Sequence, residues 1–178
     1  MRPAPMRIFG FAGWSGTGKT TLIEAIIPRL TATGLRVSLV KHAHHEFDID
    51  QPGKDSYRHR HAGCTEVLIS SRVRWALVHE LRGADELTLT QALARLSRCD
   101  LALVEGYKSA PIPKLEIWRP EIGKPLLFPD DANIVAIATS GTEPLPVGEP
   151  PRALPRYRLD DVEGIATLIL ANAHAVAI

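Results

Sequence analysis

The sequence has few of the features that mark secreted, membrane-bound or nucleic-acid-binding proteins. Only two cysteines are present, Cys64 and Cys99, and they lie far apart and form no metal-binding spacing. We therefore expect small buried thiols in a reducing compartment and exclude a disulfide framework. Lysine and arginine number 21 against 20 aspartates and glutamates, a formal net charge of +1. So small a charge excludes a strong global field towards nucleic acid or a membrane surface.

Long apolar runs, internal repeats and aromatic side chains are also scarce. No run approaches the length of a membrane span, and residues 1–5 carry no apolar signal region, so we expect a soluble cytoplasmic protein. Aromatic residues make up 6% of the chain, whereas aliphatic residues are plentiful, as in layered α/β proteins. A length of 178 residues predicts one domain over residues 1–178, with a substantial core.

The most specific motif is a glycine-rich stretch at residues 13–20, Gly-Trp-Ser-Gly-Thr-Gly-Lys-Thr, which fits the phosphate-loop pattern G-x-x-x-x-G-K-[ST] at every fixed position. Glycine lets the backbone N–H groups of such a loop turn inward around phosphate oxygens. The helix that follows adds a partial positive charge facing the anion. Lys19 would bring a full charge to the β- and γ-phosphates, and the Thr20 hydroxyl can ligate Mg²⁺. The motif predicts a single P-loop nucleotide-binding domain.

The flanks of the loop have the order that this motif requires. Residues 7–12 are typical of a short buried strand, and apolar residues recur with helical spacing from Leu22 to Leu30. Pro28 should kink this helix late in its course. Gly34 suits the end of the helix, and an apolar run at 35–40 follows.

The rest of the chain alternates between strand and helix patterns. Residues 65–70 and 75–81 predict an antiparallel hairpin beside a parallel core, and Asp160 and Glu163 have the spacing of a capping box at the start of a last helix. The Pro-rich stretch at 144–155 predicts an extended connector. Further strands are expected at 100–106, 114–118, 134–138 and 157–159, and further helices at 55–62 and 89–96. The pattern predicts an α/β, P-loop NTPase-like three-layer fold, with a mixed, mainly parallel sheet, helices on both faces and an inserted β-hairpin.

Residues 41–56 are rich in side chains that bind ligands, and three interpretations stay open. The segment could bind a transition metal or an Mg²⁺-bound water, could be a switch-like loop that contacts a second anionic ligand, or could be a solvated polar loop. Its His-x-His-His run lacks the spacing of a standard zinc site. The candidate metal ligands are His42, His44, Asp48 and Asp50, and the candidate anion contacts are Lys41, Lys54 and the histidines.

The strand predicted at 100–106 carries an acid at each end. Glu105 is at the carboxyl end, where P-loop proteins need a carboxylate for the Mg²⁺ water shell, and a structural salt bridge is the alternative. Asp100 is at the opposite end and is expected to cap or orient a turn. Gly106 would let the backbone pass close to a ligand, and Lys108 either meets a phosphate or is solvated.

Several motifs together resemble the family of molybdopterin-guanine dinucleotide biosynthesis adapter proteins, MobB. The similarity runs from about residue 7 to about residue 170, and the set of motifs in this order is specific. The motifs are Trp-Ser-Gly-Thr-Gly-Lys-Thr-Thr-Leu at 14–22, Lys-His-Ala-His-His at 41–45, Pro-Gly-Lys-Asp-Ser at 52–56, Arg-His-Ala-Gly at 60–63, Arg-Trp-Ala-Leu at 74–77, Leu-Val-Glu-Gly-Tyr-Lys at 103–108 and Asp-Asp-Val-Glu-Gly at 160–164.

The resemblance implies a GTP-binding adapter of molybdenum cofactor biosynthesis that assists the transferase joining GMP to molybdopterin. It implies a homodimer with at most weak, Mg²⁺-dependent GTPase activity, in which Lys19 and Glu105 take the catalytic positions. Molybdopterin is a further possible ligand. The residues implied to hold the nucleotide phosphates are Gly13, Ser15, Gly16, Thr17, Gly18, Lys19, Thr20 and Thr21, with Thr20 and Glu105 on the Mg²⁺ side. Those implied to face the cofactor or the partner are Lys41, His42, Lys54, Asp55 and Arg74.

One departure concerns the choice of base. A carboxylate usually selects guanine by accepting its N1–H and amino protons. The family tends to place an aspartate just after the last core strand, whereas this chain has Ser140 there. Guanine preference is then either absent or carried by backbone groups or by Glu143.

Two functions of other classes are kept as alternatives. A small-molecule kinase would need an acid to activate its acceptor, and Asp48, Asp50 or Asp55 could serve. Its lid would contain arginines, for which the candidates are Arg58, Arg60, Arg72 and Arg74. A metal-insertion GTPase would be supported only by the histidines at 42–45.

Overall fold

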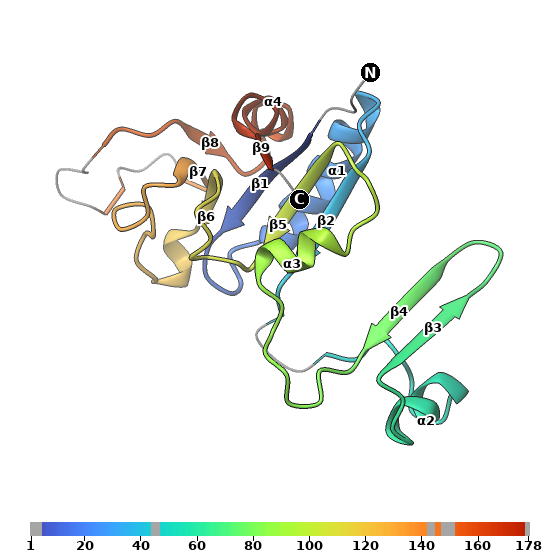
Figure 1. Ribbon diagram of the computed structural model, residues 1–178. Helices are drawn as coiled ribbons and strands as arrows, with labels where there is room; N and C mark the ends of the chain where they lie inside the picture. Colours follow the sequence, from blue (N-terminus) through green and yellow to red (C-terminus); the bar gives the residue numbers. More distant parts are fainter. Residues whose placement is uncertain (1–4, 44–46, 142–144, 147–151, 177–178) are drawn as a thin grey trace. The chain divides into compact units, whose positions relative to one another are not determined.

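The computed structural model describes residues 5–43, 47–141, 145–146 and 152–176, and it divides into two compact units (Figure 1). Unit 1 comprises Met1–His42 and Leu89–Ile178, and unit 2 comprises Ala43–Thr88. The assignment of residues 1–178 to a single P-loop domain stays a prediction.

Unit 1 is built on a mostly parallel sheet, which within the described residues has seven strands in the order β2-β5-β1-β6-β7-β8, with β9 added to β1. Every pairing is parallel except that of β9 with β1. Along β1, β9 pairs with the first half and β6 with the second half. The strands are β1 (Met6–Ala12), β2 (Val37–Lys41), β5 (Leu101–Glu105), β6 (Lys114–Trp118), β7 (Ile134–Thr139), β8 (Arg156–Arg158) and β9 (His174–Val176).

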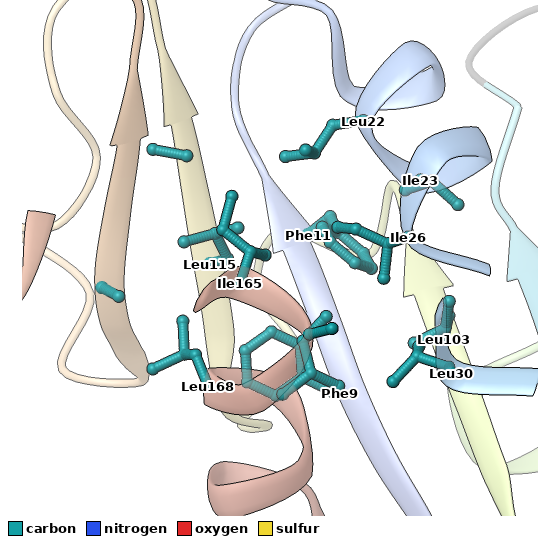
Figure 2. Close-up of a cluster of buried hydrophobic side chains, with 14 of the residues drawn as sticks. Phe9, Phe11, Leu22, Ile23, Ile26, Leu30, Leu103, Leu115, Ile165 and Leu168 are labelled. Atoms are coloured by element: carbon teal, nitrogen blue, oxygen red, sulfur yellow. The ribbon is translucent and has the colours of Figure 1, made fainter. Parts of the chain in front are cut away.

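Helices cover both faces of this sheet, as predicted. Figure 2 shows one face, where Phe9 and Phe11 of β1 pack with side chains of the helices α1 (Lys19–Ala32) and α4 (Val162–Asn172). Leu93 of α3 (Leu89–Ala94) belongs to a second cluster of buried residues. That cluster contains Ile8, which alternates with Phe9 along β1 and therefore points to the opposite face. In the described part of the chain, no helix combines the length and apolar character needed to cross a membrane.

Two details of unit 1 differ from the sequence-based expectation. The capping box was placed one residue too early, because α4 begins after Asp161, whose carboxylate accepts the N–H of Gly164 at 3.0 Å. Asp160 instead forms an ion pair with Arg158 at 2.8 Å. Strand β9 was missed, because a three-residue strand that directly follows a helix carries no periodic signal of its own.

Unit 2 contains the helix α2 (Asp55–His61) and the antiparallel hairpin of β3 (Glu66–Ser70) and β4 (Trp75–His79), which confirms the predicted hairpin. The hairpin forms a separate two-stranded sheet. Among the described residues of this unit, Arg60 is the one buried residue. The expectation of two buried thiols is therefore half wrong, since Cys99 is buried but Cys64, in unit 2, is exposed.

Candidate functional site

The glycine-rich loop connects β1 to α1, and its glycines adopt backbone conformations that other residues rarely adopt. Gly13, Gly16 and Gly18 have φ angles of 140°, 81° and 92°. A Cβ atom on Gly13 would overlap the carbonyl oxygen of Ile117 in β6, because the loop backbone packs directly against that strand. The loop is therefore a fixed turn that only this glycine pattern permits.

Lys19 bends back over the loop that precedes it. Its ammonium donates hydrogen bonds to the carbonyl oxygens of Gly13 at 2.9 Å and Trp14 at 2.8 Å. Burial lowers the pKa of Lys19 below its usual 10.5; the carboxylate of Glu105 opposes this shift, and Lys108 and Lys41 add to it. Three further charged side chains therefore lie close enough to Lys19, at the same edge of the sheet, to influence its pKa.

The first turn of α1 is open to an anion. Its N-cap residue is Gly18, no side chain of the described chain caps it, and the first turn contains no acidic residue. The N–H groups at a helix N-terminus have no intrahelical acceptor and carry partial positive charge. Thr20 and Thr21 lie exposed on this turn, whereas the buried Thr17 donates its hydroxyl to the carbonyl of Trp14 at 2.9 Å. The roles of all three towards phosphate stay predictions.

Glu105 and Lys41 meet at the carboxyl ends of neighbouring parallel strands. The register pairs Lys41 of β2 with Glu105 of β5, and Lys41 Nζ lies 3.4 Å from Glu105 Oε2. The carboxylate is nearly buried, while the Lys41 side chain is 52% exposed. The salt bridge that the sequence left as an alternative is therefore formed, and the Mg²⁺ role of Glu105 stays a prediction.

His42 and Gly106 occupy the turns that follow these two strands. The backbone N–H of His42 donates to the carbonyl of Glu105 at 2.8 Å, and its ring lies 5.1 Å from the ring of Tyr107. Gly106 has a φ of 98°, and a Cβ on it would come within 2.6 Å of the His42 carbonyl oxygen. The close approach expected at Gly106 is thus made to the protein backbone.

Three more cations contact the loop, and the sequence had singled out only Lys108 among them. Arg119, just after β6, donates from Nε to the carbonyl of Thr17 at 2.9 Å. The ammonium groups of Lys108 and Lys124 lie 4.7 Å and 5.8 Å from the centre of the Trp14 ring. A cation at the carboxyl end of β6 is the sequence signal that could have indicated Arg119.

The remaining predicted site residues belong to unit 2. Lys54 precedes α2, Asp55 begins it and lies 3.8 Å from Arg58, and Arg74 is exposed in the hairpin turn. Their predicted contacts with the cofactor or the partner stay predictions.

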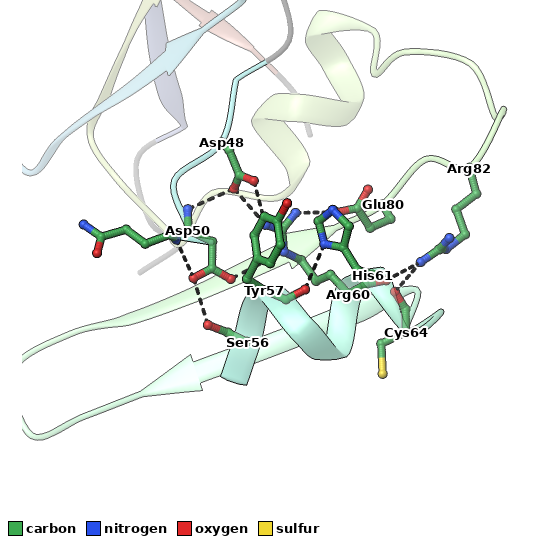
Figure 3. Close-up of polar contacts among 10 residues, drawn as sticks. Asp48, Asp50, Ser56, Tyr57, Arg60, His61, Cys64, Glu80 and Arg82 are labelled. Carbon is green, nitrogen blue, oxygen red and sulfur yellow. Dashed lines mark hydrogen bonds and ion pairs between the residues drawn. The ribbon is translucent and has the colours of Figure 1, made fainter. Parts of the chain in front are cut away.

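Three acidic residues of unit 2 gather around Arg60 (Figure 3). The guanidinium lies 2.8 Å from Asp48 and 3.5 Å from Asp50, and Glu80 lies 2.5 Å away. The hydrogen bond from Arg60 lowers the pKa of Asp48 below its usual range. Asp48 and Asp50 are therefore both paired with Arg60. Asp55, the third acid proposed for a kinase, lies beside Arg58 instead, and the kinase alternative stays a prediction.

The part of the chain that the structure describes gives no support to a transition-metal centre. There, no group of three histidine, cysteine, aspartate or glutamate side chains is placed to hold a metal ion. Two of the predicted ligand-type residues, His44 and His45, lie outside the described residues.

A phosphate-binding loop between the first strand and first helix of a mostly parallel sheet defines the class of P-loop NTPase-like α/β proteins. Within this class, the family model described as "Molybdopterin guanine dinucleotide synthesis protein B", MobB, matches residues 8–140. The chain belongs to this family, as the resemblance predicted.

Individual relatives agree with the family assignment. The chain is 40% identical over 166 residues to an Escherichia coli (strain K12) protein described as a molybdopterin-guanine dinucleotide biosynthesis adapter protein; the match covers 92% of this chain and 91% of that protein. A Haemophilus influenzae protein of the same description is 42% identical over 134 residues, 75% of this chain and 74% of its own. The crystal structure of Bacillus subtilis MobB superposes with a TM-score of 0.73 at 27% identity, covering 95% of this chain and 99% of that one.

Proposed function

We propose that the protein is a GTP-binding adapter of molybdopterin guanine dinucleotide biosynthesis in the cytoplasm. In this role it binds Mg²⁺-GTP at residues 13–20 and assists the transferase that attaches GMP to molybdopterin. The single observation that carries the nucleotide proposal is the geometry of the loop, in which Gly13 is packed against β6 and Lys19 folds over the turn. Membership of the adapter family supports the biosynthetic role.

The residues present fit a nucleoside triphosphate and a magnesium ion. The uncapped first turn of α1 supplies N–H donors, and Lys19 supplies a charge that can leave its two carbonyl acceptors for phosphate oxygens. Hard oxygen ligands for Mg²⁺ are available from Thr20, and Glu105 can hold the water shell of the ion. When bound, Mg²⁺ neutralises charge on the β- and γ-phosphate oxygens.

We expect hydrolysis by the isolated protein to be slow. Glu105, the acid at the carboxyl end of β5, already pairs with Lys41 and would be occupied with the Mg²⁺ side. Positioning of the attacking water is the main contribution of the protein in phosphoryl transfer, and a carboxylate held in this ion pair is not free to provide it. A binding and adapter role needs no rapid turnover.

We propose that unit 2 mediates contact with a second copy of the chain. Leu68 and Leu77 are opposite each other in the hairpin, and Trp75 lies on the same face because side chains alternate along a strand. Their exposed fractions are 63%, 45% and 60%. An exposed apolar face in a unit whose described residues bury no apolar side chain is best explained by a protein partner.

The nucleotide proposal is tested by titrating GTP into the wild type and Lys19→Ala in the presence of Mg²⁺, with calorimetric detection. Loss of the charge should weaken GTP binding at least about 100-fold, because charge-assisted hydrogen bonds to phosphate are among the strongest in proteins. Arg95→Ala, which removes an exposed cation on unit 1, is the matched control and should bind as the wild type does. Unchanged affinity in Lys19→Ala, or a wild type that binds no nucleotide, would overturn the proposal.

The adapter role needs a second assay, in which the protein is added to the molybdopterin guanylyltransferase. The wild type should increase formation of molybdopterin guanine dinucleotide, and Lys19→Ala should not. An equal increase by both proteins would show that nucleotide binding plays no part in the adapter role.

A further inference from the structure

At the carboxyl edge of the sheet lies a carboxylate to which the phosphate-loop assignment gives no role. Glu121 is in the short 3-10 helix η1 (Pro120–Ile122), which follows β6. The hydroxyl of Ser140, the residue after β7, donates to both carboxylate oxygens of Glu121, at 3.2 and 3.3 Å. Both residues are exposed, so a ligand can reach them.

The strand order separates this carboxylate from the Mg²⁺ side of the loop. In the order β2-β5-β1-β6-β7, the loop follows β1, and Lys41 and Glu105 are the last residues of the two strands on one side of it. Glu121 and Ser140 follow β6 and β7, on the other side. A nucleotide with its terminal phosphates towards Glu105 therefore extends its nucleoside towards β6 and β7.

Contacts within unit 1 fix η1 to the phosphate loop. Arg119, immediately before η1, donates to the carbonyl of Thr17 at 2.9 Å, and a Cβ on Gly18 would lie 3.3 Å from its guanidinium. A Cβ on Gly16 would lie 3.5 Å from Ile122 Cδ1, at the end of η1. The position of Glu121 is thus tied to that of the loop.

The chemistry of a carboxylate suits one purine and not the other. Guanine presents N1–H and an amino group side by side, and a carboxylate accepts both hydrogen bonds. Adenine presents an unprotonated N1 at the same place, and its lone pair faces the carboxylate oxygens. A single hydroxyl donor such as Ser140 orients the carboxylate and leaves most of its lone pairs for the base.

We propose that Glu121 distinguishes guanine from adenine in this protein, with Ser140 as its positioning residue. The proposal rests on the proposed function, since it assumes that a nucleotide occupies the loop. It also accounts for base selection in a chain that has a serine at position 140.

The test compares the affinities of GTP, ATP and tripolyphosphate, each with Mg²⁺, for the wild type and Glu121→Gln. The wild type should prefer GTP to ATP, and Glu121→Gln should lose about 30-fold or more in GTP affinity, because its amide cannot accept both guanine protons. Its affinities for ATP and tripolyphosphate should change little. Xanthosine triphosphate should bind Glu121→Gln better than the wild type, since the amide N–H can donate to the xanthine 2-oxo group.

Two further variants separate positioning from general damage. Ser140→Ala should lower the GTP-to-ATP affinity ratio by about threefold to tenfold and leave tripolyphosphate binding unchanged, and Ser140→Thr, which keeps the hydroxyl, should restore the ratio. Glu24→Gln, an exposed glutamate on α1, is the matched control and should bind all ligands as the wild type does.

The outcomes distinguish this inference from the function on which it rests. A wild type that binds neither GTP nor tripolyphosphate overturns the proposed function and this inference together. A wild type that binds GTP, with an unchanged GTP-to-ATP ratio in Glu121→Gln, overturns the role of Glu121 alone.

Discussion

The interior of unit 1 is apolar, whereas that of unit 2 is charged. In unit 1, apolar side chains such as Phe9, Leu103 and Ile165 are completely buried between the sheet and its helices (Figure 2). In unit 2, the buried residue of the described part is a charged one, Arg60, and the apolar side chains of the hairpin, including Leu68, are exposed.

The difference indicates which unit can position a ligand by itself. Burial of apolar surface is the main source of folding free energy, and a rigid core can hold strained glycine turns such as that at Gly13. A small unit without an apolar core needs a partner surface or a polar network for its stability. Unit 1 is therefore suited to hold the phosphate loop, and unit 2 is suited to form contacts with another protein.

The largest expected effect is a loss of stability in unit 1, whose apolar core holds the phosphate loop. Gly13→Ala should lower the free energy of unfolding by about 3 kcal/mol, because a left-handed backbone strain adds to an overlap with the Ile117 carbonyl that cannot relax easily. Gly34→Ala, also at positive φ but with no atom near its Cβ, should cost only about 1 kcal/mol. Urea denaturation of both variants provides the measurement, and equal losses would argue against a packed loop.

Removing the guanidinium from unit 2 should have a large but local effect. Arg60→Leu leaves the carboxylates of Asp48, Asp50 and Glu80 facing one another without a counter-charge. We expect hydrogen exchange in α2, β3 and β4 to become at least about tenfold faster, while unit 1 keeps its protection.

The control for Arg60 lies on the same helix. Arg58→Ala breaks only a surface contact with Asp55 at 3.8 Å and should leave exchange unchanged. If Arg60→Leu also exchanged at the wild-type rate, the polar cluster would not be what holds unit 2 together.

A charge on the exposed hairpin face should act on assembly rather than on folding. Leu77→Asp would place a carboxylate in the proposed contact with a second copy. We expect the dissociation constant of the dimer to rise at least about tenfold relative to the wild type. Sedimentation measurements over a range of concentrations report the change. Leu87→Asp, elsewhere in unit 2, should sediment like the wild type. A Leu77→Asp variant that dimerises as tightly as the wild type would locate the interface away from the hairpin face.

The smallest expected effect concerns an ion pair at the far end of the sheet from the loop. Arg36 lowers the pKa of Asp100 from its usual 3.8 to about 2, mainly by a hydrogen bond to the carboxylate. Because the folded-state pKa is the lower one, this stabilisation is present above about pH 3.8 and is lost as the pH falls through about 2.

Asp100→Asn should therefore unfold at slightly lower urea concentration than the wild type at pH 7, and the difference should vanish near pH 2. Urea midpoints at several pH values provide the comparison. A difference that persists at pH 2 would mean that the carboxylate acts through its shape and not through its charge.

The sequence by itself determined the order of strands and helices in unit 1, except for β9, and the conformation of the phosphate loop. Both depend on local requirements: apolar periodicity in the strands and helices, and glycine at positive φ in the loop. The N-cap of α4 was misplaced by one residue, since Asp160 and Asp161 are equally able to cap and only the helix position chooses between them.

Only the tertiary structure decided which distant side chains meet. Arg119 reaches Thr17 because the sheet order places β6 beside β1, and Ser140 reaches Glu121 because β7 lies beside β6. The pairing of Asp48 with Arg60 likewise arises where chain segments fold back on each other. Such contacts join residues that share no local pattern, so their physical basis appears only when the strands have been placed in order.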